Sequence, residues 1–189
     1  MDEPIDEPKN QSKSWIKSFL VEVFKFALII IFVIIPFRIF VAQPYIVSGE
    51  SMSPTFADGD YLIVDQLTYR LRDPHRGDVI ILHPPHTEGT YFTKRVIGLP
   101  GETVSINQGN VTIIKADGTK EPLNETYIKL PKYETANFSV PQDSYFVMGD
   151  NRAGSYDSRA WGVLERDKVA GRPFLRLFPL KSLDIWPGE

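Results

Sequence analysis

The sequence contains no cysteine. This absence excludes a disulfide scaffold, a thiol nucleophile and a zinc site with cysteine ligands, while an oxidising compartment stays compatible with the chain. A strong charge of either sign is missing as well, because 21 Lys and Arg stand against 24 Asp and Glu among 189 residues. Without a long basic stripe, nucleic acid is not an expected partner.

Metal-ligating patterns are also scarce. His75, His83 and His86 lie in or near the Pro-rich segment "HPPHTEG", without the helical spacing that places two imidazoles on one metal ion. The oxygen-rich segment "GDNRAGSYD" lacks the residue order of a calcium loop. We therefore expect surface-loop histidines, no metal and no cofactor.

One long apolar run is present, from Ser18 to Ala42, and about 20 apolar residues suffice to cross a bilayer as a helix. Its charge-free centre, residues 26–37, is shorter, so a buried helix and the core of a signal peptide are the alternatives. Lys25 and Arg38 flank this centre and can extend toward the polar interface. We predict a single N-terminal transmembrane helix over residues 18–42, with a kink at Pro36.

The flanks of this run predict its orientation. No Lys or Arg occurs between Arg38 and Arg70, whereas lysines precede the run at Lys9, Lys13 and Lys17. Residues 1–17 are expected to form a cytoplasmic tail, disordered in its first part, and residues 43–189 an extracytoplasmic domain. The run lacks a signal-peptide cleavage site with small residues at both key positions. The chain is therefore predicted to be a single-pass protein of the cell membrane.

Beyond residue 42 the pattern changes to short β-prone segments separated by turns rich in Gly, Pro, Asn and Asp. Neither a fixed repeat period nor an alternation with long helices is present, so a solenoid and a parallel sheet are not indicated. We predict a mainly β domain of folded antiparallel sheets or a partial barrel. Residues 103–141 are expected to form an insertion or cap rather than core. The predicted strands are "YLIVDQL", "GDVIILH", "YFTKRVIGL", "ETVSIN", "NVTII", "SYFVMGD" and "VAGRPFLRLFPL".

A serine nucleophile is the most informative candidate for chemistry, in the segment "VSGESMSPTF" directly after the apolar run. A serine hydroxyl needs a base to remove its proton, and a lysine held neutral by desolvation is one known base. Lys94 lies on a β-prone segment whose alternation points it away from Thr93 and Arg95. We expect Lys94 to face an apolar site within hydrogen-bond reach of Ser51, and Arg95 to face a carboxylate on the polar side. The alternative for Lys94 is an ordinary strand lysine in solvent.

Four segments together resemble the type I signal peptidases, membrane-bound serine proteases with a Ser/Lys dyad. "SMSPTF" is similar to the nucleophile box of that family, "RGDVII" to its second box, "YFTKRVIGLPG" to its lysine box and "GDNRAGSYDSRAWG" to its last box, in the family order. The resemblance extends from just after the apolar run to about Gly162. A single N-terminal anchor is typical of the simpler members.

The resemblance implies a role for each matching residue. Ser51 is the nucleophile, Lys94 is the general base, and the Ser155 hydroxyl orients the lysine amine. A hydroxyl can fix the lone pair of a neutral lysine, whereas a carboxylate in contact would favour the ammonium. Residues implied to support the site through ion pairs, hydrogen bonds or packing are Asp157, Arg159, Asp150, Arg95 and Met52.

One departure from the family concerns the oxyanion that forms during acyl transfer. The backbone N–H of Ser51 is one expected donor. Some members carry a second serine two residues before the nucleophile, but this chain has Gly49 there and Ser48 is displaced by one residue. The second donor is therefore open between the backbone around Gly49, the Ser48 hydroxyl after local rearrangement, and a water molecule.

The resemblance implies that Ser51 attacks the scissile carbonyl and that Lys94 carries the proton to the leaving amine, through an acyl-enzyme. The expected substrates are exported preproteins with Ala-x-Ala-like residues before the cut, and the expected partners are these preproteins and the lipid bilayer. Only nine residues separate Ala42 from Ser51, at most about 30 Å, so the nucleophile is expected near the outer membrane face. Residues expected to bind an extended substrate by strand addition are Gln43, Pro44, Tyr45, Ile46, Val47, Tyr91, Phe92 and Thr93.

Two rival functions remain for the sequence alone. A self-cleaving repressor or regulatory protease with the same dyad would need a DNA-binding module in place of the apolar run. A membrane-anchored β binding module would use the serines as a linker and leave Lys94 on its surface. The second rival predicts that Ser51→Ala and Lys94→Ala leave function intact.

Overall fold

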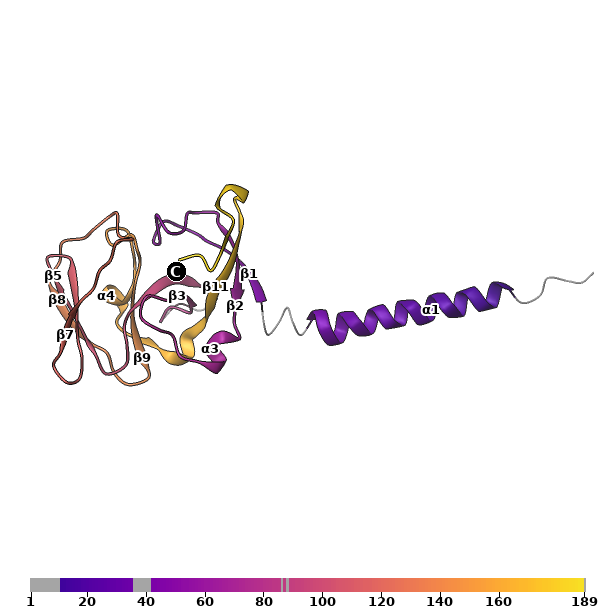
Figure 1. Ribbon diagram of the computed structural model, residues 1–189, viewed down its shortest axis with the longest axis horizontal. Coiled ribbons are helices and arrows are strands. Elements are labelled where there is room, and N and C mark those ends of the chain that lie inside the picture. The colour runs from indigo at the N-terminus through magenta and orange to yellow at the C-terminus, as the bar shows by residue number, and fades with distance from the viewer. Residues whose placement is uncertain (1–10, 36–41, 86, 88, 189) are drawn as a thin grey trace, which may run out of the picture. The chain divides into compact units, whose positions relative to one another are not determined.

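The computed structural model describes residues 11–35, 42–85, 87 and 89–188, and the chain divides into two compact units at residues 40 and 41 (Figure 1). The first unit contains helix α1 (Gln11–Ile29), which continues into the π-helical turn η1 (Ile30–Ile34). The predicted kink at Pro36, the flanking Arg38 and His86 lie outside the described residues.

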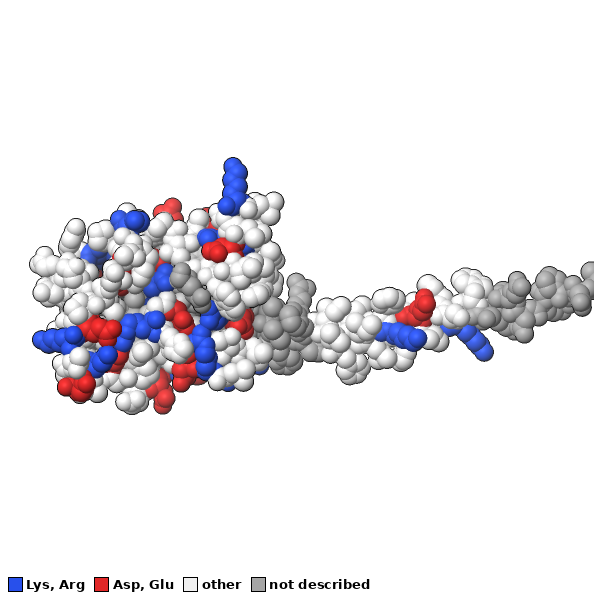
Figure 2. Space-filling model, viewed as in Figure 1, with Lys and Arg blue, Asp and Glu red and all other residues white. Residues whose placement is uncertain are grey.

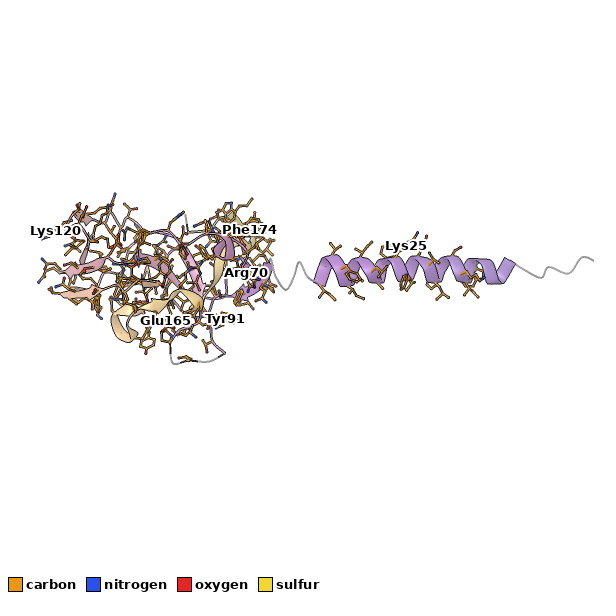
Figure 3. All side chains as sticks on the ribbon, turned by 90° about the horizontal axis from the view of Figure 1, so that it is seen from below. Lys25, Arg70, Tyr91, Lys120, Glu165 and Phe174 are labelled. Atoms are coloured by element: carbon orange, nitrogen blue, oxygen red, sulfur yellow. The ribbon has the colours of Figure 1, made fainter. Side chains whose placement is uncertain are left out.

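Helix α1 begins at Gln11, so residues 11–14 are helical although the sequence predicted a disordered tail there. None of residues 15–35 is buried, and their side chains project outward all round the helix (Figure 3). Charged groups are confined to the first part of the helix, and the surface beyond Lys25 carries none (Figure 2). Along the described stretches of the chain, no helix combines the length and the apolar composition needed to cross a membrane. The span over residues 18–42 therefore stays a prediction.

The second unit is mainly β, with curled antiparallel sheets, as predicted. Its larger sheet has eight strands in the order β1-β2-β11-β3-β4-β9-β10, and β12 also pairs with β11. All of these pairs are antiparallel. The strands are β1 (Ala42–Ile46), β2 (Tyr61–Asp65), β3 (Val79–Leu82), β4 (Phe92–Gly98), β9 (Ser144–Met148), β10 (Leu164–Glu165), β11 (Val169–Phe178) and β12 (Asp184–Ile185).

The predicted insertion forms a sheet of its own, with four strands in the order β7-β6-β5-β8 (Figure 1). These strands are β5 (Thr103–Asn107), β6 (Asn110–Ile114), β7 (Lys120–Pro122) and β8 (Ala136–Ser139). This small sheet contributes to the core, although the sequence predicted a cap. Val104 and Ile113 are fully buried in one cluster with Phe146 of β9 and Ile97 of β4. Apolar residues alternate along β5 and β6, so one face of the small sheet packs against the large one.

Short helices and turns complete the second unit, namely α3 (Thr68–Leu71), α4 (Ser158–Trp161), η2 (Arg166–Lys168) and η3 (Leu180–Ser182). Each predicted strand is present, with ends within a few residues of the prediction. Strands β3 and β9 are buried along their whole length, because they lie inside the large sheet with packed residues on both faces. Strand β4 lies between these two and carries Lys94.

Candidate active site

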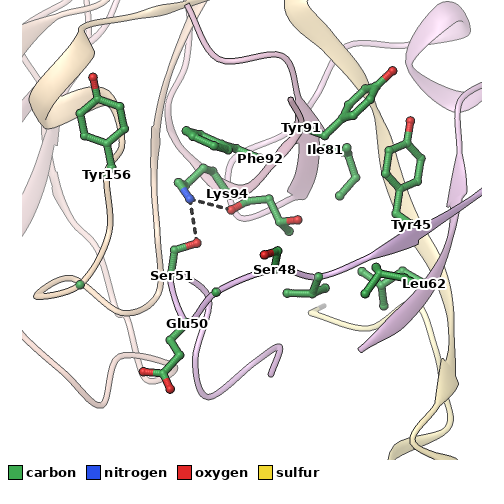
Figure 4. Close-up of a pocket in the computed structure, with 15 residues that line it drawn as sticks. Tyr45, Ser48, Glu50, Ser51, Leu62, Ile81, Tyr91, Phe92, Lys94 and Tyr156 are labelled. Atoms are coloured by element: carbon green, nitrogen blue, oxygen red, sulfur yellow. Dashed lines mark hydrogen bonds between the residues drawn. The ribbon is translucent and has the colours of Figure 1, made fainter. Parts of the chain in front are cut away.

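The side chains of Ser51 and Lys94 meet although 43 positions separate them in the sequence. Lys94 Nζ lies 2.8 Å from Ser51 Oγ, so the predicted contact is present (Figure 4). Ser51 begins the turn that follows β1, and Lys94 is the third residue of β4. The geometry brings a hydroxyl and an amine within the reach needed for proton transfer.

Lys94 is held in a dry environment, since only 3% of the residue is exposed. Desolvation by burial lowers the pKa of its amine from 10.5 to about 8, although the charges of Asp157 and Asp150 act in the opposite direction. Besides Ser51, the amine contacts the carbonyl oxygen of Thr93 at 3.1 Å. A lysine with this pKa is neutral in a useful fraction near neutral pH and can act as a base.

Arg95 faces a carboxylate, but not on a polar, solvated side of the sheet as expected. Its guanidinium forms two hydrogen bonds to Asp150, at 2.9 and 2.6 Å, and both side chains are buried. Its third nitrogen donates to the carbonyl oxygens of Gly77 and Gly188. A guanidinium has five N–H groups, and this many partners explain how it stays charged inside the protein. Two buried cations therefore follow one another on β4, one paired and one desolvated.

Asp157 and Arg159 form a second buried pair beside the dyad. Arg159 donates to both carboxylate oxygens of Asp157 at 2.8 Å, and Asp157 also accepts the N–H of Gly149. Burial alone would raise the pKa of the Asp157 carboxyl, but the hydrogen bonds and the charge of Arg159 outweigh it and lower the pKa overall. Asp157 therefore stays ionised and raises the pKa of Lys94, and the charge of Arg159 partly offsets this effect.

The Ser155 hydroxyl does not make its expected contact with the lysine amine. Its Oγ is buried and, within the described residues, has no hydrogen-bond partner, while it lies near the Asp157 carboxylate without hydrogen-bond geometry. The backbone of Gly149 passes so close to Ser155 and to the carbonyl of Ser51 that a side chain there would clash with both. The hydroxyl is thus packed beside the dyad, and its role stays a prediction.

The loop around the nucleophile explains the glycine at position 49. Gly49 has a φ of +88°, a conformation that side chains rarely adopt, so a serine there would strain the backbone. Its N–H donates to Asp58 at 2.7 Å and is not directed at a substrate. Ser48 lines the pocket beside Ser51, and Met52 is buried in a core cluster of the catalytic unit. Of the predicted second oxyanion donors, the Gly49 N–H is therefore already used.

A pocket of about 250 Å³ opens beside the dyad. Its two long walls are residues 45–51 and 91–94, which include most of the predicted substrate-binding residues: Tyr45, Ile46, Val47, Tyr91, Phe92 and Thr93 (Figure 4). Gln43 and Pro44 do not line the pocket. The side chain of Gln43 instead accepts hydrogen bonds from Tyr45 and Gln66. Ser48 and Gly49, which the sequence named only in connection with the oxyanion, also line the pocket, and the sequence prediction missed the remaining lining residues: Glu50, Leu62, Ile81, Gly154 and Tyr156.

The segment "RGDVII" supports the fold at its start and reaches the site at its end, where Ile80 lies opposite Lys94 in the sheet and Ile81 lines the pocket. Arg76 pairs with Glu102 at 2.6 Å, and Asp78 accepts hydrogen bonds from Tyr69 and Arg72. The His83 ring packs against Tyr91, whose ring also contacts Tyr45. No group of His, Asp or Glu side chains suited to a metal ion comes together in residues 11–35 and the described parts beyond residue 41.

A comparison of the sequence with known proteins identifies the family of the chain. A family model described as "Signal peptidase, peptidase S26" matches residues 20–178, which is most of the chain and includes Ser51 and Lys94. The chain belongs to the signal peptidase family, peptidase S26. Its activity is accordingly that of a serine endopeptidase that removes signal peptides from preproteins.

Individual signal peptidases show the extent of the similarity. A probable signal peptidase I-2 of Synechocystis is 40% identical over 154 residues, 78% of this chain and 68% of its own length. A signal peptidase I P of Bacillus subtilis is 36% identical over 187 residues, 93% of this chain and 94% of its own length. A crystal structure of a signal peptidase I from Enterococcus faecalis is 33% identical, with a TM-score of 0.45, over 53% of this chain and 97% of that one.

Proposed function

We propose that this signal peptidase cleaves with a dyad of Ser51 and Lys94. The 2.8 Å contact between Ser51 Oγ and the buried Lys94 amine carries the proposal. Ser51 Oγ attacks the scissile carbonyl while Lys94 Nζ accepts the hydroxyl proton, and Nζ returns the proton to the leaving amine. Water, activated by the same amine, then hydrolyses the acyl-enzyme.

Two open strand edges support binding of an extended substrate between them. Strand β1 is the last strand of the large sheet and pairs only with β2 among the described strands. Strand β4 pairs with β9 from Arg95 onward, so residues 92–94 have no partner on that side within the described sheet. A preprotein segment in the pocket can form backbone hydrogen bonds to both edges.

The size of the pocket supports small side chains next to the cut. Leu62 and Ile81 supply apolar surface to a pocket of only about 250 Å³, and Tyr45 and Tyr91 close its far end with an edge-to-face contact. A cavity of this size, shared between several substrate residues, has room for alanine-sized side chains. We therefore propose cleavage after Ala-x-Ala-like sequences.

The proposal includes a membrane anchor over residues 18–42, with the N-terminus in the cytoplasm and the catalytic unit outside. The apolar run and the lysines before it support this arrangement, and the signal peptidase family is generally membrane-associated. Apolar side chains are also exposed at the end of the β11–β12 hairpin, at Phe178, Leu180, Leu183 and Ile185. Such an exposed patch suits contact with lipid.

Substitution of each dyad member tests the mechanism. Ser51→Ala and Lys94→Ala should each abolish cleavage of a purified preprotein in detergent, and Lys94→Arg should also be inactive because a guanidinium stays charged. Ser53→Ala, in the same loop but outside the dyad, is the matched control and should retain activity. Cleavage by folded Ser51→Ala or Lys94→Ala would refute the dyad.

A protease-protection assay tests the topology separately. Protease added outside sealed, right-side-out vesicles should digest the unit beyond residue 42 and leave a protected N-terminal fragment. Protection of the catalytic unit would contradict the proposed orientation without affecting the dyad.

A further inference from the structure

The peptide unit between Glu50 and Ser51 is held by its carbonyl group. The Glu50 carbonyl oxygen accepts hydrogen bonds from Asn151 Nδ2 and from the N–H of Ser53, both at 3.1 Å. In a trans peptide the C=O and N–H groups point in opposite directions, so fixing the carbonyl of Glu50 also fixes the direction of the Ser51 N–H. That N–H donates to no group within the described residues. It is therefore free to bind an oxyanion.

Asn151 holds the neighbouring peptide unit as well. Its backbone N–H donates to the carbonyl oxygen of Ser51 at 3.1 Å. Its side-chain Oδ1 accepts the N–H of Gly154 at 2.9 Å, which fixes the orientation of the amide and leaves Nδ2 facing Glu50. A single residue thus binds the carbonyl groups on both sides of the nucleophile.

Asn151 is itself rigidly placed, with 5% of the residue exposed. On one side its neighbour Asp150 pairs with Arg95, and on the other side Arg152 forms a buried bidentate ion pair with Glu125 of the insertion. A backbone bridge also joins Asn151 to Leu130. Donors that act on a developing charge are effective when they are held in place before the reaction, and these contacts supply that rigidity.

We propose that Asn151 is the positioning residue of the oxyanion hole. Its side-chain amide aligns the Ser51 N–H with the acyl oxygen of the bound preprotein, and the hydrogen bond to Glu50 strengthens that N–H as a donor through polarisation of the peptide. Asn151 does not touch the substrate. Its importance is increased by Gly49, which offers no side-chain donor and whose own N–H is bound to Asp58. The inference rests on the proposed role of Ser51.

Two substitutions separate the amide donor from the rest of the side chain. Asn151→Asp keeps an oxygen for the Gly154 N–H but places a carboxylate oxygen against the Glu50 carbonyl, and Asn151→Ala removes both contacts. Either change should lower kcat roughly tenfold to a hundredfold with KM unchanged, somewhat less than complete loss of an oxyanion donor. Rates are compared on the alkaline plateau, because an introduced carboxylate raises the pKa of a nearby lysine. Asn137→Ala, at an exposed position on β8, is the matched control.

A pair of inhibitors distinguishes positioning from a general structural role. A substrate-derived peptide aldehyde adds to Ser51 Oγ, takes up the hydroxyl proton and leaves an oxygen where the oxyanion forms, whereas the same peptide ending in a carboxamide cannot add. The aldehyde should lose affinity for both Asn151 variants by the same factor as kcat, while the carboxamide should bind unchanged. Misfolded protein binds neither inhibitor, so partial misfolding lowers both apparent affinities alike and leaves their ratio unchanged.

The outcomes separate this inference from the dyad. If Asn151→Asp keeps full kcat, or if both inhibitors weaken equally, Asn151 does not position the oxyanion hole. Cleavage by Ser51→Ala would instead refute the proposed function on which the inference rests. Inactive Ser51→Ala together with fully active Asn151→Asp would leave the dyad intact and overturn this inference alone.

Discussion

The acid limb of the pH profile of cleavage should report the pKa of Lys94. The base must be neutral to accept the Ser51 proton, so activity is lost as pH falls through that pKa. With a pKa of about 8, roughly one lysine in ten is neutral at pH 7, against roughly one in three thousand for an unperturbed amine at 10.5. The buried environment therefore increases the reactive fraction at neutral pH by a factor on the order of 300.

The measurement is kcat/KM for a purified preprotein in detergent, because this quantity follows ionisation of the free enzyme. It should rise about tenfold per pH unit up to pH 7, then bend near pH 8 and level off above pH 9. The expected ratio of activity at pH 9 to activity at pH 7 is about ten. A preprotein with a mutated cleavage site serves to check that the substrate does not unfold across this pH range.

Asp157→Asn should move this limb in a defined direction. The Asp157 charge is the largest influence that raises the pKa of Lys94, and its removal leaves the opposing charge of Arg159 with Glu134 as its remaining ion-pair partner. The limb should therefore shift to lower pH, in a variant whose amide keeps the shape of the carboxylate. A limb that stays near pH 10 in the wild type, or that shifts to higher pH in Asp157→Asn, would refute the account of a desolvated lysine.

Three further predictions concern stability and the nucleophile loop. Lys94→Met should raise the free energy of unfolding at pH 7 by up to about 3 kcal/mol, because the amine of the folded wild type binds protons less readily than that of the unfolded chain. In urea titrations the free energy of unfolding of the wild type should rise between pH 8 and 10.5, and that of Lys94→Met should not show this rise. Ser48→Ala should lower kcat on the order of a hundredfold if its hydroxyl is the second oxyanion donor, and unchanged kcat would leave water in that role. Glu125→Gln should cost roughly 1–3 kcal/mol in urea unfolding, because it weakens the ion pair between Glu125 and the buried Arg152.

Seven of the twelve strands in the described structure were predictable because their sequence signals are local, whereas the strands β1, β7, β8, β10 and β12 were not among the predicted ones. Segments such as "NVTII" combine β-branched residues with flanking turns, and the structure places β6 there. The pairing of strands was not predictable in the same way. Strand β11 lies between β2 and β3 in the large sheet, far from both in sequence, and such contacts depend on packing of the whole domain.

The contact between Ser51 and Lys94 was predictable from four ordered segments, whereas the surroundings of the two residues were not. Alternation along β4 predicted opposite directions for Lys94 and Arg95, but it could not show that both faces of the strand are covered. Asn151 lies in the last of the four segments, but the sequence did not indicate its role, because its partners Glu50 and Ser51 lie about a hundred positions away. The position of Tyr156 in the pocket wall had no signal either.

In the proposed binding mode, the edge of β4 at residues 92–94, which no strand of the described sheet pairs on the β9 side, makes the enzyme sensitive to the conformation of its substrate as well as to its sequence. A helix already uses its backbone N–H and C=O groups internally, so it cannot also bond to a sheet edge. A tight turn cannot reach along both β1 and β4. Under this proposal only a stretch of preprotein that is still without secondary structure can complete the sheet, so suitable sequences inside folded proteins are expected to escape cleavage.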